Sequence, residues 1–467
     1  MKNQFQKYLP FLLPGLIFIM LTWVSFSYLN NFFHHFDNEN ASLFFFNEGF
    51  RQIDLRDALC GWNEQGVPLL RCVSLTMGDG TDKTFYLPIE TIGDDKGIFY
   101  FIPLVARLFA TDHISAYLIF FTTLIVAGFI IGSVGFSLLF AQKRVRLICN
   151  IGWGLFSFFC FYIMDVYVWA FFLIAFIPLL LWILKNKNFK WWCVSALAIG
   201  MLIGFAGIFR NHAGTGLLLL IIGSLFLAKE IKIAHKAIVI AMVIIAMFLP
   251  KLWFQQIVNE RNQWLVENNF DRSLLQSFEN THIIWHGLYL GLAYDEDNPY
   301  GIEWLDEYAH KKANEYVNQN MDKTQLPTMA QIFFPDNYKQ YLQTHPEYPV
   351  FSQLFLPQQY DGIAKSFFME IFEKNSFYVL KIAVLKAFKV LWELLKFFNI
   401  GLVFFFLVRP PWKITAAVLL PIAFYALPAV LVWPYDAYIL GGLGIVVVST
   451  LLLVGNYLRK SISYQLS

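Results

Sequence analysis

Two acidic clusters lie beside apolar stretches near the start of the chain. HHFDNEN at 34–40 presents Asp37 and Glu39 directly after the first apolar stretch. A carboxylate fixed there would orient or deprotonate a hydroxyl nucleophile, and a solvated turn is the alternative. Asp94, Asp95 and Lys96 lie in GDDKGIFYFIPLVARLF. Such acids bind a divalent cation through oxygen ligands or hold a sugar hydroxyl, and a helix-capping turn is the alternative.

Two further clusters combine histidine with other ionisable residues. FRNHAGTG at 209–216 holds Arg210 and His212 between two apolar stretches. A guanidinium binds phosphate oxygens in a bidentate way, and snorkelling to lipid headgroups is the alternative. His282 and His286 are four residues apart and would share one helix face. They would bind zinc only with a third ligand, which the spacing does not identify, so we assign no metal ligands. Substrate contacts and a plain structural role are the alternatives.

The composition requires a membrane environment for the elements that position these clusters. Of the 467 residues, 57% are hydrophobic and only 15% are charged, which no soluble protein of this size can bury. Several apolar stretches approach the roughly 20 residues that cross a bilayer. We expect an all-α polytopic membrane protein with ten spans near 9–29, 116–141, 147–164, 166–184, 191–209, 214–228, 236–254, 391–408, 415–433 and 437–456, with the shorter apolar segment 98–110 as a half-helix or interfacial piece.

The orientation follows from the short connections, because Lys and Arg are biased to the cytoplasmic side. One set of loops is rich in basic residues, whereas the short turns on the other side contain only Asp165, Arg210 and Asp436. An N-in, C-in topology satisfies every loop. Arg210 is then an exception that needs a reason, and Tyr435 and Asp436 face the same outer side. The net charge of +2 does not indicate nucleic-acid binding.

This topology divides the chain into three parts. Residues 1–254 form a seven-helix module with an outer loop at 31–97, residues 255–376 form a large extracytoplasmic segment, and residues 377–467 return to the membrane. The lysines between Phe377 and Lys396 indicate an amphipathic entry along the interface or a snorkelling start to the eighth span. Cys60 and Cys72 lie in the first outer loop, where an oxidising compartment would permit a disulfide; two buried thiols are the alternative.

The arrangement resembles the GT-C class of membrane glycosyltransferases. The shared pattern is a first helix, an outer loop beginning with acids, the entry to the second helix GDDKGIFYFIPLVARLF, and seven spans before a large outer segment. A second stretch, WHGLYLGLAY…NPYGIEWLDE, is similar to one in uncharacterised bacterial membrane proteins grouped with such transferases. The acids of the class are often adjacent, whereas Asn38 separates Asp37 from Glu39 here. Either could therefore be the base.

The resemblance implies sugar transfer at the periplasmic face of a bacterial inner membrane. The donor would be a polyprenyl-phosphate-linked sugar, with its chain in a groove between helices and its phosphate on Arg210, helped by His212. The acceptor would be a cell-envelope glycan, a lipid or a protein. A polymerase or ligase of lipid-linked glycans and a membrane transporter are the rival interpretations; a transporter would carry ionisable residues at mid-membrane depth and show paired broken helices.

Overall fold

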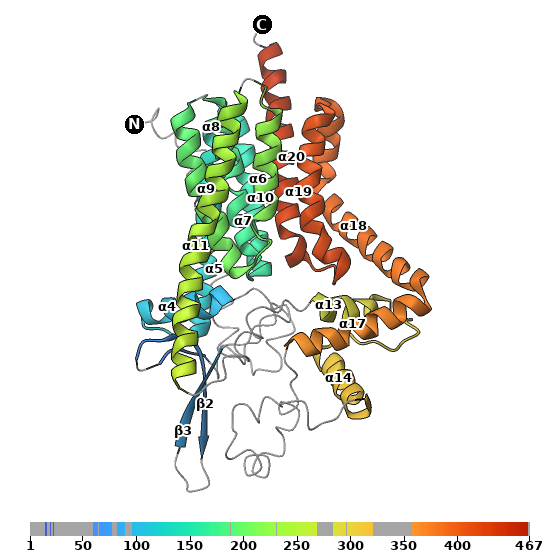
Figure 1. Cartoon of the computed structure of the whole chain (residues 1–467). Helices are drawn as coiled ribbons and strands as arrows, with labels where there is room; N and C mark the ends of the chain where they lie inside the picture. Colours follow the sequence, from blue (N-terminus) through green and yellow to red (C-terminus); the bar gives the residue numbers. More distant parts are fainter. Residues whose placement is uncertain are drawn as a thin grey trace.

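The computed structural model describes residues 59–63, 65–76, 82–88, 96–186, 188–229, 231–268, 284–295, 297–320 and 357–465, together with the single positions 15, 19 and 22. Long helices form an upright bundle in this part of the chain (Figure 1). Two smaller units lie beyond the same end of the bundle. The predicted sites Asp37, Glu39, Asp94, Asp95 and His282 lie outside the described residues.

The first half of the bundle begins with α4 (Lys96–Phe109), where a half-helix or an interfacial piece was expected at 98–110. Helix α5 (His113–Leu139) follows, and the Asp112 side chain caps it by accepting from the Ser115 N–H at 2.9 Å. The expected span at 166–184 is broken into two short helices at Ala175–Phe176. The remaining elements of this half are α6 (Lys143–Ile163), α7 (Val168–Ile174), α8 (Ile177–Lys185), α9 (Phe189–Phe209), α10 (Thr215–Leu227) and α11 (Ile233–Glu267).

Helices α9 and α11 approach closely because small residues line their contact. A Cβ placed on Gly200 would lie 2.5 Å from the Val243 carbonyl oxygen, and one on Gly204 would collide with the Met247 carbonyl. Glycines four residues apart let membrane helices pack backbone to backbone. The turn at Arg210 therefore has a fixed position relative to α11.

A small antiparallel sheet, in the order β1-β2-β3, lies beside the far end of α11. Its strands are β1 (Leu59–Trp62), β2 (Pro68–Thr76) and β3 (Asp82–Pro88). The Asn63 side chain closes the first hairpin by accepting from the Gln65 and Val67 N–H groups at 3.0 and 2.8 Å. Leu70 packs on Leu265 of α11. The sequence analysis expected an outer loop here and did not predict strands, so the fold is helical with a small sheet added.

The second half of the described chain contains α13 (Ile284–Leu290), η1 (Gly291–Tyr294), α14 (Asp306–Asn320), α17 (Pro357–Lys374), α18 (Ser376–Val408), α19 (Trp412–Leu431) and α20 (Asp436–Gln465). Helices α13, α14 and α17 share a hydrophobic core with η1 and the first turns of α18, separate from the bundle core; it includes Tyr289, Ile363 and Ile382. We call this unit the outer module.

Eight described helical segments, with α7 and α8 counted together as one, are long and apolar enough to cross a bilayer, which makes the chain a multi-pass membrane protein. They correspond to eight of the ten expected spans. The ninth, expected at 214–228, is the shorter helix α10 with 13 residues. The tenth, expected at 9–29, lies outside the described residues apart from single positions. Both α11 and α18 are much longer than expected, with 35 and 33 residues.

The two ends of the bundle differ in the way that the charge distribution predicts. The C-terminal ends of α8, α18 and α20, which border the basic loops, lie at one end, whereas α4, the sheet and the outer module lie at the opposite end (Figure 1). We call the latter the outer end. That this end faces away from the cytoplasm remains a prediction from the charge bias.

Candidate functional site

The turn between α9 and α10 holds Arg210 and His212 at the outer end. Arg210 ends α9, and its N–H still donates to the Ala206 carbonyl at 2.8 Å. The Ala213 N–H donates back to the Arg210 carbonyl at 3.0 Å, so the turn is tight. The buried Tyr425 hydroxyl of α19 donates to the Ala213 carbonyl at 2.6 Å. A helix from the second half of the bundle thus fixes this turn.

Tyr167 brings the side chains of the turn together. The Arg210 guanidinium carbon lies 5.1 Å from the centre of the Tyr167 ring, in a cation–π contact. The His212 ring centre lies 5.6 Å from that of Tyr167, and the Tyr438 ring centre lies at 5.2 Å. Tyr167 is buried and lies two residues after the buried Asp165. The aromatic face orients the guanidinium, whose planar N–H fork matches the geometry of a phosphate or carboxylate.

Two lysines come close to the same turn from other helices. Gly97 at the start of α4 packs against Ile208, where a Cβ would lie 2.9 Å from the Ile208 Cγ2 atom, so Lys96 is adjacent to the end of α9. The Lys251 ammonium of α11 donates to the Asn211 Oδ1 atom at 3.3 Å. Lys96, Arg210 and Lys251 are each half-buried. The end of α9 therefore carries Arg210, contacts Lys251 of α11 through Asn211, and packs against the turn of α4 that follows Lys96. We call Lys96, Arg210 and Lys251 the cationic group.

Aromatic side chains surround this cationic group on its α4 and α11 side. Phe209 packs on Phe101, Phe120 and Trp169, with ring centres 5.0 to 5.3 Å apart. Tyr100 packs edge-on against Trp253 at 5.9 Å. Burial, and secondarily the Glu260 charge, raises the pKa of Tyr100. Aromatic rings of this kind are enriched at the level of lipid headgroups.

Asp436 faces a different set of partners. It begins α20, and its carboxylate interacts electrostatically with Glu393, Lys389 and Lys396 of α18. Glu393 is buried and accepts from Lys389 at 2.7 Å and from Lys396 at 2.8 Å. Tyr435 and Tyr438, which flank Asp436 in the sequence, instead extend toward Tyr167. Their ring centres lie 5.8 Å apart. Asp436 thus belongs to a charge network between α18 and α20.

His286 lies in the outer module, where its Nδ1 atom hydrogen-bonds with the Tyr360 hydroxyl of α17. The backbone N–H of the preceding residue, Trp285, donates to the Asp361 carboxylate at 2.9 Å. His286 is buried, so these contacts fit a role in packing α13 on α17. His282 is not described, and the predicted pairing of the two histidines stays a prediction.

A continuous series of aromatic rings joins the outer module to the Arg210 turn. Trp304 stacks on Trp433 at 4.4 Å and donates its indole N–H to the Tyr435 hydroxyl at 2.8 Å. Tyr294 of η1 packs on Trp433 at 5.3 Å. Through Tyr438 the series reaches Tyr167. Two of the predicted site residues, Arg210 and His212, thus meet at the Tyr167 ring, and Lys96 precedes the contact of Gly97 with Ile208, whereas His286 belongs to the outer module and Asp436 begins α20.

The other predicted features give no further site among the described residues. In this part of the chain no group of three or more His, Cys, Asp or Glu side chains could hold a metal ion, and the paired acids expected to bind a cation are not described. Cys60 and Cys72 belong to neighbouring strands β1 and β2, but their side chains lie outside the description.

The sequence analysis missed Tyr167 and Lys251. Only tertiary packing shows the contact of Tyr167 with Arg210. Lys251 did carry a signal, because it is a lone charge in the apolar stretch of α11. Comparison with known proteins adds no assignment: no family model, no curated protein and no solved structure matches this chain.

Proposed function

We propose that this chain is a membrane glycosyltransferase that transfers a sugar from a polyprenyl-phosphate-linked donor to an acceptor at the outer end. The acceptor would be an extracytoplasmic glycan, lipid or protein. The observation that carries the proposal is the cationic group of Lys96, Arg210 and Lys251 at the outer end of spanning helices, in which Tyr167 orients Arg210. Cations at the end of an apolar bundle suit a ligand with a phosphate head and a hydrocarbon chain.

The cationic group would contribute most in the transition state of transfer. The acceptor oxygen attacks the anomeric carbon, the bond from that carbon to the phosphate oxygen breaks, and the polyprenyl phosphate leaves as an anion. Fixed positive charge at the departing phosphate lowers the barrier, because the negative charge grows as the bond breaks. Arg210 would bind the phosphate oxygens with its N–H fork, and the acceptor proton would pass to Asp37 or Glu39, as the resemblance implies.

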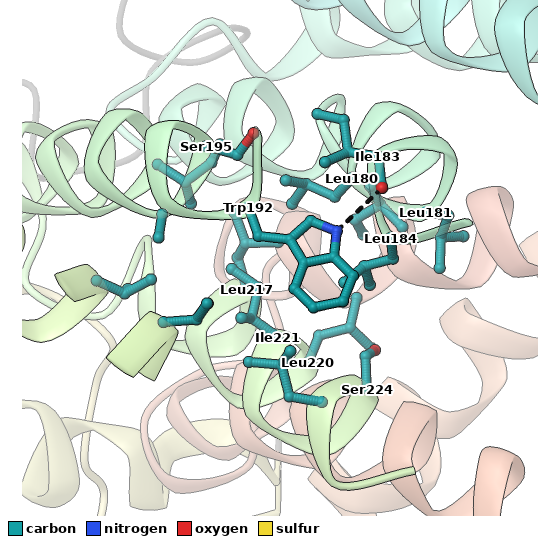
Figure 2. Close-up of a pocket in the computed structure, with 16 residues that line it drawn as sticks. Leu180, Leu181, Ile183, Leu184, Trp192, Ser195, Leu217, Leu220, Ile221 and Ser224 are labelled. Atoms are coloured by element: carbon teal, nitrogen blue, oxygen red, sulfur yellow. Dashed lines mark hydrogen bonds between the residues drawn. The ribbon is translucent and has the colours of Figure 1, made fainter. Parts of the chain in front are cut away.

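An apolar pocket between α8, α9, α10 and α11 supports binding of a hydrocarbon chain. Apart from Trp192, Ser195 and Ser224, its lining residues are all aliphatic (Figure 2). The Trp192 indole N–H is satisfied by the Ile183 carbonyl at 3.1 Å, so it presents its apolar ring to the pocket. The pocket is lined by the first halves of α9 and α11, so it lies nearer the basic-loop end of the bundle than the Arg210 turn does, and α10 connects the two through Leu217. A prenyl chain anchored at Arg210 could follow α10 into the bilayer.

The first experiment measures ligand binding by thermal unfolding of the purified chain in detergent. We expect polyprenyl phosphate to raise the unfolding midpoint of the wild type, and neutral polyprenol to raise it much less. Arg210→Ala should lose the phosphate-dependent part, and Arg210→Lys should retain some of it because the charge remains but the bidentate fork is lost. Arg107→Ala is the matched control, since this arginine is exposed at the end of α4.

The second experiment measures transfer itself. Membranes containing the chain are incubated with a panel of radiolabelled polyprenyl-phosphate sugars, and label in the acceptor fraction is counted. Arg210→Ala and Asp37→Asn should each abolish incorporation without changing the amount of protein in the membrane. Full transfer by both variants would remove these residues from the site, and equal stabilisation of wild type and Arg210→Ala by polyprenyl phosphate would contradict the phosphate assignment.

Two rival functions use the same architecture. A polymerase or ligase would require a lipid-pyrophosphate glycan as donor, so it would be inactive with the monosaccharide carriers. A transporter is favoured by one observation, the buried Glu393 within a spanning helix, because buried ionisable groups in membrane helices mark ion or substrate paths. Uptake of a solute into proteoliposomes that contain no lipid carrier would support transport.

A further inference from the structure

Helix α18 is much longer than a bilayer requires. It has 33 residues. At a rise of about 1.5 Å per residue it is about 50 Å long, against a hydrocarbon core of about 30 Å. One side of its first half is buried against protein, through Tyr378, Ile382, Lys386 and Val390. In Figure 1 this half leans away from α19 and α20 and reaches the outer module, so the helix has a protein-facing side well beyond the bundle.

The opposite side of the same half is apolar and exposed. Phe377 is 77% exposed, Leu380 61% and Phe388 66%. These residues and Val384, Leu391 and Leu395 recur every three or four positions, so they form one stripe along the helix. No charged side chain belongs to this stripe. A stripe of this size would be costly to expose to water.

Of the lysines in this half, Lys381 borders the stripe and the others lie off it, and all are engaged by other groups of the protein. Lys381 pairs with Asp295 of the outer module. The buried Lys386 donates to the Leu431 and Val432 carbonyls at 3.2 and 2.7 Å. Lys389 and Lys396 share Glu393. These lysines thus contact the protein, and the choice between an amphipathic entry and a snorkelling start of the span stays a prediction.

The apolar stripe continues without interruption into the lipid-facing side of the spanning half. Leu402 and Phe406, 40% and 65% exposed, extend the same line. From Phe377 to Phe406 the stripe is about 44 Å long, at about 1.5 Å per residue. A straight helix would need a tilt of about 45° to hold all of it in the hydrocarbon core, beyond the usual range of tilts. Part of the stripe must therefore have another environment.

We propose that the outer half of α18, along Phe377, Leu380, Val384 and Phe388, lies in the headgroup and upper acyl region of the outer-end leaflet. The occupant of this face is lipid, because the face is continuous with the lipid-facing side of a spanning helix and has the pattern of an interfacial amphipathic helix. The outer module, built on the other side of the same turns, then rests on the membrane surface. This inference does not depend on the proposed glycosyl transfer.

The test measures the environment of single positions in the full-length chain in phosphatidylcholine nanodiscs, which leave both membrane faces accessible. The five native cysteines are replaced by alanine, and a spin label is attached at Leu380→Cys, Phe388→Cys or Lys374→Cys. The control position, Lys374, is exposed at the end of α17. We expect labels at 380 and 388 to collide several-fold more with oxygen, relative to a water-soluble nickel chelate, than the label at 374.

Two outcomes would overturn the proposal. Labels at 380 and 388 that behave like the one at 374 would place the stripe in water, and labels shielded from both reagents would place it against protein. A second measurement retains the native cysteines: a benzophenone amino acid at position 388 or 374 is photolysed in nanodiscs containing tritiated phosphatidylcholine. Label transfer to the chain from 388 but not from 374 is expected, and a protein adduct or no lipid adduct at 388 contradicts the inference.

Discussion

Substituting one of two adjacent glycines in α20 should disturb the Arg210 turn, whereas substituting the other should not. Tyr425, which holds the Ala213 carbonyl, lies between Gly441 of α20 and Gly216 of α10. A Cβ added at Gly441 would lie 2.5 Å from the Tyr425 Cε1 atom. That is about 1 Å short of an ordinary carbon–carbon contact. The ring cannot simply retreat, because its other edge already fills the space beside Gly216.

The expected size of the effect follows from two opposing terms. Overpacking of this kind costs about 1 to 3 kcal/mol, and alanine in place of glycine in a helix returns at most about 1 kcal/mol. Gly442→Ala is the matched control, because its Cβ would meet its nearest neighbour at 3.6 Å and only the helix term applies. We therefore expect Gly441→Ala to be less stable than Gly442→Ala by about 1 to 3 kcal/mol.

The assay is thermal unfolding of both variants in detergent, followed by intrinsic tryptophan fluorescence, with and without polyprenyl phosphate. Gly441→Ala should show a lower unfolding midpoint and a smaller stabilisation by the ligand, and Gly442→Ala should match or exceed the wild type. Equal midpoints for the two variants would refute the packing argument. A lower midpoint with undiminished stabilisation would refute the coupling of Tyr425 to the Arg210 turn.

Further predictions concern the links among α18, α19 and the outer module. Lys386→Met should lower the unfolding midpoint, at a cost of about 1 to 3 kcal/mol, because the Leu431 and Val432 carbonyls lose a charged donor; an unchanged midpoint would contradict it. The hydrogen bond from Lys381 holds the pKa of Asp295 below its usual range. The stability that this pair contributes is therefore complete above the ordinary aspartate pKa of about 3.9 and is lost as the pH falls through the lower pKa of the folded state. The midpoints of wild type and Asp295→Asn should differ at neutral pH and converge on acidification, and a constant difference would contradict the assigned pair.

Local sequence signals predicted the membrane helices well because hydropathy is a property of short segments. The structure follows the expected spans closely for α5, α6, α9, α19 and α20. It departs where tertiary contacts extend or interrupt a helix. Helix α11 continues to Glu267 because its last turns support the sheet through Leu265 and Trp264. The break between α7 and α8 did carry a local signal that the sequence analysis did not use: Pro178 lies in the first turn of α8, and proline ends a preceding helix and favours the first turn of the next.

The candidate site was predicted only in part, for a related reason. Arg210 stood out because a lone cation on the side poor in positive charge violates a statistical bias that sequence alone shows. Its partner Tyr167 lies 43 positions away, and an aromatic residue in an apolar chain gives no comparable signal. Asp436 was identified from its position in a loop, but its side chain interacts with α18, which sequence spacing does not reveal.

The two overlong helices give the outer end its organisation. Helix α11 carries the sheet beyond the bundle, and α18 carries the outer module. Each is continuous with a spanning segment, so both units are attached directly to the bundle. The Arg210 turn is linked to the outer module through the aromatic series from Trp304 to Tyr167, and to α11 through Lys251. On the proposed function, a substrate with one part in the bilayer and another in water would bind at this turn, between the helices that carry the two units.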